Sequence, residues 1–173
     1  MASKTPDGPL FADLNDADPA VVEAVSEARR TFPQFVDAVS KRLFSPAVYA
    51  VKVAFIDRSQ VRKEALVRTP ETAAENPTKP TCHLWLSVTS IMDGLIFCSV
   101  REAPDALQLK SGSSFVVASD SIDDWLINHD GIAFGGFSLR VIRSRFSQMQ
   151  QKRFDVHTGI REFKTLRRSQ SSK

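Results

Sequence analysis

The chain has 173 residues, of which 42% are hydrophobic and 25% are charged, and its formal net charge is +3. This composition is typical of a globular domain that can bury a sizeable core without disulfide bonds. Two cysteines are too few for a disulfide framework, and no apolar run is long enough for a membrane span or a signal-peptide core, so we expect a cytoplasmic protein.

The first part of the chain predicts a flexible lead-in followed by helices. Residues 1–17 are rich in proline and acidic residues and predict a segment that precedes the domain. Asp18 followed by Pro19 is typical of a helix start, with a capping side chain before a proline in the first turn. Apolar residues then recur at helical spacing, and Thr31 with Pro33 resembles a second helix start. The pattern predicts either two short helices or one helix with a bend at Pro33.

The middle of the chain predicts strands and a long loop. Residues 48–57 (V-Y-A-V-K-V-A-F-I-D) alternate in the manner of a β-strand. Residues 58–80, which include Glu71 and Glu75, show no periodicity and predict a loop that is either functional or disordered. The run H-L-W-L-S-V-T-S-I-M-D-G-L-I-F-C-S-V then predicts a hairpin that turns at Asp93-Gly94, because glycine accepts a positive φ at little cost.

The last third of the chain predicts one more strand, an ambiguous segment and a final helix. A turn at 110–112 precedes the strand-like S-F-V-V-A-S. Residues 121–127 fit either a short helix or a strand, and they lead to a turn at Asp130-Gly131. From Ser138 to Met149 apolar residues recur every three or four positions, which predicts a helix.

These elements predict an α+β fold in a single domain over residues 18–149. We expect N-terminal helices packed on a curved antiparallel sheet of about four or five strands, with a C-terminal helix after the sheet. Residues 150–173 then form a basic C-terminal extension.

Charge is distributed unevenly along the chain. Residues 140–173 contain ten lysine and arginine residues and two acidic residues, a net charge of +8. The first 139 residues contain 13 basic and 18 acidic residues, a net charge of −5. The basic C-terminus either contacts an anionic partner, nucleic acid or protein, or is a solvated end without a partner.

The stretch D-D-W-L-I-N-H-D-G-I-A-F-G-G-F-S-L-R, residues 123–140, contains the residue types of an active site. Asp123 and Asp124 are sequence neighbours, which do not face one another on a helix or a strand, so we expect them to cap a turn and stay solvated. His129 stands in an ordinary turn sequence. Gly135-Gly136 lacks the pattern of a phosphate-binding loop and indicates close backbone packing or a φ that only glycine tolerates. We therefore expect this stretch to be scaffold.

The pair Cys82-His83 is the other candidate for chemistry. A nucleophilic cysteine needs a histidine near it in space, but neighbours on a strand point to opposite faces, so His83 is expected to be a structural or surface residue. The three histidines of the chain have no spacing typical of a metal site. We therefore expect no enzymatic activity, no cofactor and no metal. Trp85 and Trp125 lie in apolar runs and are expected to be buried, with Gly94, Gly135 and Gly136 as structural glycines.

Five segments in a fixed order carry a family likeness. They are A-V-Y-A-V-K-V-A-F-I-D, H-L-W-L-S-V-T-S-I-M-D-G, L-K-S-G-S-S-F-V-V, I-D-D-W-L-I and G-G-F-S-L-R-V-I-R. Over residues 18–146 the chain resembles the bacterial YegJ-like domain-of-unknown-function family. It departs from the family at Cys82, where an acidic residue is usual, in the longer loop 58–80, and after Phe146, where the family has no clear counterpart. The resemblance implies a small bacterial cytoplasmic module without assigned catalytic residues, of a kind often encoded beside toxins as immunity partners.

We expect a non-enzymatic protein-binding module, of the immunity type that neutralises a toxin or partner enzyme by occupying its active site. Exposed carboxylates of turns and loops would meet the partner. These are Asp93, Asp120, Asp123, Asp124, Glu71 and Glu75. The alternative is a nucleic-acid-binding accessory protein that uses the basic C-terminus, where few aromatic residues are interleaved for base stacking. A third hypothesis is an unrecognised hydrolase that uses His83 or His129.

Overall fold

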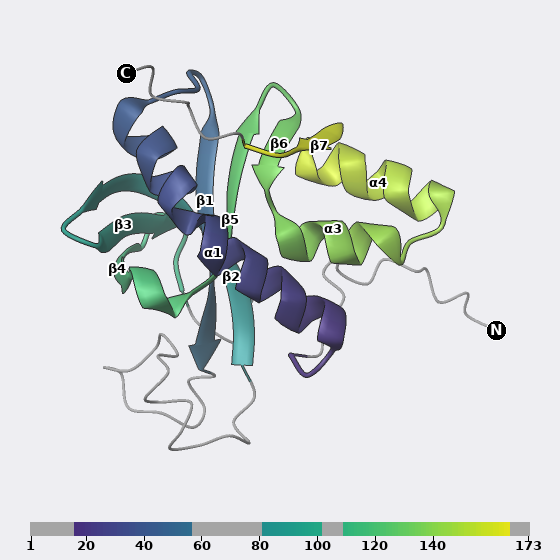
Figure 1. Cartoon of the computed structure of the whole chain (residues 1–173), viewed down its shortest axis with the longest axis horizontal. Coiled ribbons are helices and arrows are strands. Elements are labelled where there is room, and N and C mark those ends of the chain that lie inside the picture. Colours follow the sequence, from purple (N-terminus) through teal and green to yellow (C-terminus); the bar gives the residue numbers. More distant parts are fainter. Residues whose placement is uncertain (1–15, 57–80, 102–108, 167–173) are drawn as a thin grey trace.

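A long N-terminal helix, a seven-stranded sheet and two shorter C-terminal helices form the part of the chain that the structure describes (Figure 1). The computed structural model describes residues 16–56, 81–101 and 109–166, so Glu71, Glu75 and the long predicted loop lie outside the described residues. The helices are α1 (Pro19–Lys41), α3 (Phe137–Ser144) and α4 (Gln148–Thr158), with a short 3-10 helix, η3 (Ser119–Ser121). The strands are β1 (Val48–Ile56), β2 (Thr81–Met92), β3 (Leu95–Val100), β4 (Ser114–Ala118), β5 (Ile122–His129), β6 (Ile132–Gly135) and β7 (Glu162–Lys164).

The helix α1 begins where the sequence predicts a helix start. The Asp18 carboxylate accepts a hydrogen bond from the backbone N–H of Ala20 (2.9 Å), which satisfies one of the free donors of the first turn. α1 is one continuous helix rather than two. The Thr31 hydroxyl donates to the backbone carbonyl of Glu27 (2.7 Å), one turn earlier, instead of capping a new helix, and Pro33 lies on the exposed side.

The strands form one sheet in the order β4-β3-β2-β1-β5-β6-β7. Neighbouring strands are antiparallel except β6 and β7, which are parallel. The predicted α+β class is confirmed, whereas the sheet is mixed and has more strands than expected. β6 and β7 contain four and three residues, too few for alternation to reveal a strand, and the ambiguous segment 121–127 is mostly β5.

Both predicted Asp-Gly turns are confirmed as hairpin turns. Asp93 and Gly94, between β2 and β3, have φ values of 51° and 74°. Asp130 and Gly131, between β5 and β6, have φ values of 49° and 80°. Two successive residues with positive φ match the right-handed twist of the flanking strands, which is why this turn type joins hairpins.

One face of the sheet packs against α1 to form the main core. α1 lies across this face of the sheet (Figure 1). Alternate residues of the central strands point to the same face and pack against the apolar residues of α1. The buried residues are Ala28, Phe32, Phe35 and Ala38 of α1 with Val51, Val53, Phe55, Leu84, Leu86, Ile96, Cys98, Val100, Val117, Ile122, Trp125 and Ile127 of the strands. Trp125 is 1% exposed, and its indole N–H donates to the Ala28 carbonyl and the Thr31 hydroxyl (3.1 Å each). The prediction that Trp125 is buried is confirmed, but Trp85 is only half-buried.

Two helices follow β6 where the sequence predicted one over residues 138–149. α3 ends at Ser144, and a new helix starts after Ser147. The Ser147 hydroxyl accepts from the Gln150 backbone N–H, while the Gln150 side chain accepts from the Ser147 N–H. This reciprocal cap is a strong start signal in the middle of a continuous apolar pattern, and it separates the helices.

The C-terminal helices form a second, smaller core with the end of the sheet. Its buried members are Ala133, Leu139, Ile142, Phe154 and Ile160, and Trp85 and Leu126 pack against them. Residues 150–158 belong to α4 and 162–164 form β7, so this part of the basic extension is built into the fold. No helix within the three described ranges is long and apolar enough to cross a membrane.

Candidate functional site

Asp124, from the motif-rich stretch 123–140, is a buried structural acceptor. It lies on β5 and is completely buried, contrary to the expectation that it stays solvated. Its carboxylate accepts hydrogen bonds from the backbone N–H groups of Trp125 (2.8 Å), Phe137 (3.2 Å) and Ser138 (2.7 Å), and from the Ser138 hydroxyl (2.7 Å). Gly136, which precedes α3, has no side chain for a cap, so Asp124 caps α3 from a different element.

Burial raises the pKa of Asp124 to about 6, and the hydrogen bonds from Ser138 and Trp125, followed by the charge of Lys52, oppose this rise. The raised pKa is therefore that of a structural carboxylate in a dry site. Such a shift marks functional sites in many enzymes, but structural networks cause it as well. Each donor here comes from the protein backbone or from Ser138, which favours the structural explanation.

The two glycines and the arginine of the same stretch also hold the scaffold together. A Cβ atom on Gly135 would overlap the Trp125 carbonyl oxygen and indole ring, and Gly135 has a φ of 73°, so both predicted reasons for a glycine are confirmed there. The Arg140 guanidinium donates to the carbonyls of Gly135 (3.0 Å) and Lys164 (2.9 Å) and lies over the Phe163 ring. Asp124, Gly135 and Arg140 of the stretch 123–140 therefore hold the fold together.

A polar cluster lies beside these residues and draws its members from β1, β2, β5, α1 and the segment before α1. His83 Nε2 is 3.4 Å from Asp123 Oδ2 and 3.6 Å from Asp16 Oδ1. Asp123 is also 3.4 Å from the guanidinium of Arg29 on α1. Lys52 pairs in register with both Trp85 and Asp124, and burial lowers the pKa of this lysine against the opposing pull of nearby carboxylates.

Both histidines singled out in the sequence have partners within the protein. The ion-pair partners of His83 are carboxylates, and a carboxylate orients the ring of structural and catalytic histidines alike. The ring Nδ1 of His129 lies 2.7 Å from the Pro46 carbonyl, and its Nε2 lies 3.9 Å from Asp130 Oδ2. Lys52 was not among the predicted site residues. The sequence could have indicated it, because Lys52 is the one charged residue in the apolar run that forms β1.

An exposed apolar patch lies at the tip of the β2–β3 hairpin and on β4. Met92 is 59% exposed, Leu95 43% and Val116 53%, while the alternate residues of β3 and β4 are buried in the main core. The backbone N–H of Ser119 donates to the carbonyl of Gly94 (3.2 Å), which brings the η3 corner against the hairpin turn. Two exposed carboxylates, Asp93 and Asp120, therefore border the patch. We call Met92, Asp93, Leu95, Val116 and Asp120 the hairpin surface.

Four of the six carboxylates predicted to meet a partner lie in the described residues, and their environments differ. Asp93 and Asp120 are exposed and lie together on the hairpin surface. Asp123 is partly buried and paired with Arg29 and His83, and Asp124 is fully buried. The prediction that these carboxylates are exposed and free was therefore wrong for Asp123 and Asp124, because both lie on the strand β5 and not in an exposed turn.

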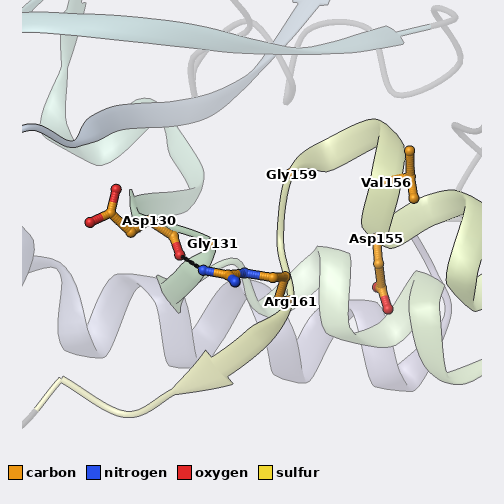
Figure 2. Close-up of a pocket in the computed structure, with 6 residues that line it drawn as sticks. All are labelled: Asp130, Gly131, Asp155, Val156, Gly159 and Arg161. Carbon is orange, nitrogen blue, oxygen red and sulfur yellow. Dashed lines mark hydrogen bonds between the residues drawn. The ribbon is translucent and has the colours of Figure 1, made fainter.

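The pocket of about 540 Å³ shown in Figure 2 lies between the β5–β6 turn and α4. It is lined by Asp130, Gly131, Asp155, Val156, Gly159 and Arg161. Its polar groups have partners within the protein. The Arg161 guanidinium donates to the Asp130 carbonyl, and Asp155 accepts two hydrogen bonds from Arg143 (2.7 and 2.8 Å), as shown in part in Figure 2.

Much of the positive charge after residue 140 is paired within the fold. Arg143 is bound to Asp155, and Arg145 to Asp18 (2.5 Å). Arg140 and Arg161 donate to backbone carbonyls. These arginines are therefore less available to phosphates than the net charge of +8 suggests. Within the described ranges, no group of three or more histidine, cysteine or acidic residues is arranged to hold a metal ion.

Comparison with known proteins places the chain in a bacterial context. A family described as uncharacterised proteins conserved in bacteria, DUF2314, matches residues 18–163. This match continues past Phe146, so the expectation that the following segment has no family counterpart was wrong as far as residue 163. The chain is 26% identical over 154 residues to a putative ankyrin repeat protein of Neisseria meningitidis serogroup B, an alignment that covers 85% of this chain and 54% of that protein. The chain thus spans about half the length of this relative. No solved structure matches.

Proposed function

Since the chain belongs to the uncharacterised bacterial family DUF2314, we propose that it is a non-enzymatic protein-binding module whose binding site is the hairpin surface. The observation that supports this proposal is the exposure of Met92, Leu95 and Val116 beside two exposed carboxylates. Large apolar side chains gathered on a surface and bordered by polar groups are typical of protein interfaces.

The chemistry of the hairpin surface indicates the kind of partner. An apolar centre with Asp93 and Asp120 at its border fits a protein surface that offers an apolar pocket beside lysine or arginine side chains. Enzymes that act on nucleic acids have such basic clefts, and an acidic inhibitor can occupy them. The proposal therefore includes the immunity type of function, in which this chain neutralises a toxin or partner enzyme in the bacterial cytoplasm. The resemblance to YegJ-like domains supports the same proposal.

The alternatives have less support from the described residues. The internal pairing of Arg143 and Arg145 is an argument against the hypothesis that the C-terminus binds nucleic acid. For a hydrolase that uses His83 or His129, the observed partners, carboxylates for His83 and the Pro46 carbonyl for His129, identify no nucleophile. The polar cluster around Lys52 remains a candidate for a second contact region.

Reversal of charge on the hairpin surface tests the proposed function. We expect the double variant Asp93→Lys, Asp120→Lys to associate with the partner about tenfold or more slowly, because complementary charge acts mainly on the association rate. The partner is first isolated from the source bacterium by affinity capture and identified by mass spectrometry. Association and dissociation rates of the purified pair are then measured by surface plasmon resonance at several salt concentrations.

A matched control distinguishes an effect of the hairpin surface from an effect of the net charge of the protein. The double variant Glu23→Lys, Glu162→Lys changes the charge of the protein equally at exposed positions on α1 and β7 and should associate at the wild-type rate. The variant Met92→Ala, Leu95→Ala should instead speed dissociation, because apolar anchors act on residence time. Wild-type rates for all hairpin-surface variants would place the interface elsewhere.

Salt dependence tests the nucleic-acid alternative directly. We expect single- and double-stranded DNA and RNA to bind weakly and without sequence preference, with affinity falling steeply as salt rises, because Arg143 and Arg145 are already bonded to carboxylates of the protein. Fluorescence anisotropy with labelled oligonucleotides measures this binding, and a variant truncated after residue 166 provides the comparison. A tight complex that survives physiological salt and disappears on truncation would reverse the ranking of the two functions.

A further inference from the structure

We propose that two copies of this chain associate through the outer edges of their β4 strands, which form a continuous sheet across a two-fold axis. β4 ends the sheet, and no described residue pairs with its outer edge. The strand S-F-V-V-A contains no charge and no proline, and it pairs with β3 in a regular register without a bulge. An edge with these properties is open to strand addition.

The two edges of the sheet differ in how they are protected. β7, at the opposite end, has only three residues, and Glu162 and Lys164 occupy two of them. Short length and charged side chains are the usual means by which proteins prevent association at an edge. β4 lacks both, and its outward side chain Val116 is 53% exposed. The contrast indicates that the β4 edge is kept suitable for pairing.

The hydrogen-bond pattern shows which backbone groups of β4 face outward. Val100 donates to the Ser113 carbonyl (2.9 Å) at one end of the β3–β4 ladder, and Ser119 donates to the Gly94 carbonyl (3.2 Å) at the other. Both bonds lie in the register that pairs Leu95 with Ala118 and Ser99 with Ser114. Because bonded pairs alternate along an antiparallel ladder, Phe115 and Val117 face β3. The N–H and C=O groups of Ser114, Val116 and Ala118 therefore point to the open edge.

Ser114, Val116 and Ala118 of one copy can pair with the same three residues of a second copy. In an antiparallel pair centred on Val116, Val116 lies opposite its own copy, and Ser114 of each chain lies opposite Ala118 of the other. Every outward backbone group of the three residues then finds a partner, and two valine side chains meet on one face, a favourable cross-strand pair.

The charge of the strand is compatible with this register. No like charges lie opposite one another, because Ser114–Ala118 contains no charged residue. The pairing also joins the two hairpin surfaces along one face of the extended sheet.

The first test introduces a charge at the centre of the proposed strand pair and measures dimerisation. Sedimentation equilibrium of the full chain over a range of micromolar to millimolar concentrations should show a monomer–dimer equilibrium. The variant Val116→Lys places two lysines opposite one another at the axis and should weaken dimerisation at least about tenfold. Val156→Lys, at an exposed position on α4, is the matched control and should dimerise like the wild type. Circular dichroism confirms that both variants are folded.

A cross-link tests the register itself. Residues opposite one another in a bonded antiparallel pair have Cα atoms about 5.5 Å apart, within the range that a disulfide spans. Val116→Cys should form a covalent dimer under mild oxidation, visible on a non-reducing gel and lost with a thiol reductant, whereas Val156→Cys should not. A wild-type chain that is monomeric throughout the concentration range would overturn the proposal, as would equal dimerisation of wild type and Val116→Lys. Protection of β4 amides from hydrogen exchange only when a different protein is bound would assign the edge to that protein and overturn the proposal as well.

Discussion

Replacing Trp125 with alanine is expected to lower the free energy of unfolding by about 3–5 kcal/mol, the cost of truncating a large aromatic side chain in a core. The indole is buried against Phe35 and Phe137, and its N–H is bonded to Ala28 and Thr31 of α1. The truncation thus removes packing between α1 and β5 and leaves the Thr31 hydroxyl without this donor. Urea unfolding followed by far-UV circular dichroism measures the change.

Two further variants separate the effect of burial from the effect of the indole hydrogen bonds. Trp85→Ala should cost less than Trp125→Ala, because Trp85 is half-buried beside the smaller core. Trp125→Phe retains most of the packing but not the hydrogen bonds, so it should unfold at an intermediate urea concentration even if the alanine variant does not fold. Equal losses for both tryptophans would contradict the difference in burial described above.

The second large effect is a pH dependence of stability that comes from Asp124. The pKa of its carboxyl is about 6 in the folded protein, and an aspartate in an unfolded chain has a pKa of about 3.9. Between these values the folded state binds a proton that the unfolded state does not, so stability falls as pH rises. The expected contribution is a loss of about 3 kcal/mol from pH 4 to above pH 6. Urea unfolding at closely spaced pH values measures it.

The variant Asp124→Asn isolates this contribution. It cannot titrate, so its unfolding free energy should change less between pH 4 and 6.5 than that of the wild type, although its absolute stability is lower because the amide nitrogen cannot accept from Ser138. Carboxylates bound to arginine, such as Asp18 and Asp155, have lowered pKa values and lose their stabilising effect at lower pH. Parallel pH profiles for the wild type and Asp124→Asn would show that Asp124 titrates normally.

Local signals in the sequence predicted the elements with strong periodicity or strong turn residues. The Asp18-Pro19 start, the alternation of β1 and the two Asp-Gly turns each depend on a few neighbouring residues, and each is confirmed. β6 and β7 could not be predicted in the same way. They are short, and they are strands because they pair with β5 and with each other.

The candidate site was predictable only in part, for a related reason. The exposure of Asp93 follows from its place in a tight turn, which the sequence specifies. The burial of Asp124 does not, because it depends on the N–H groups of Phe137 and Ser138, which reach it from the start of α3. The gathering of Met92, Leu95 and Val116 depends on the register of three strands, which alternation alone leaves open.

The position of β1 in the sheet determines when the domain can form during synthesis. β1 bonds to β2 on one side and to β5 on the other. Val48 pairs with Asn128, so this pairing cannot form until the ribosome has synthesised β5. Until then one edge of the central strand is open, and Trp125 is not yet present to join α1 to the sheet. Contacts between such distant segments slow folding and leave apolar surface uncovered in the nascent chain. The pairing of β1 with β5 and the contact of Trp125 with α1 can therefore form only after β5 has left the ribosome.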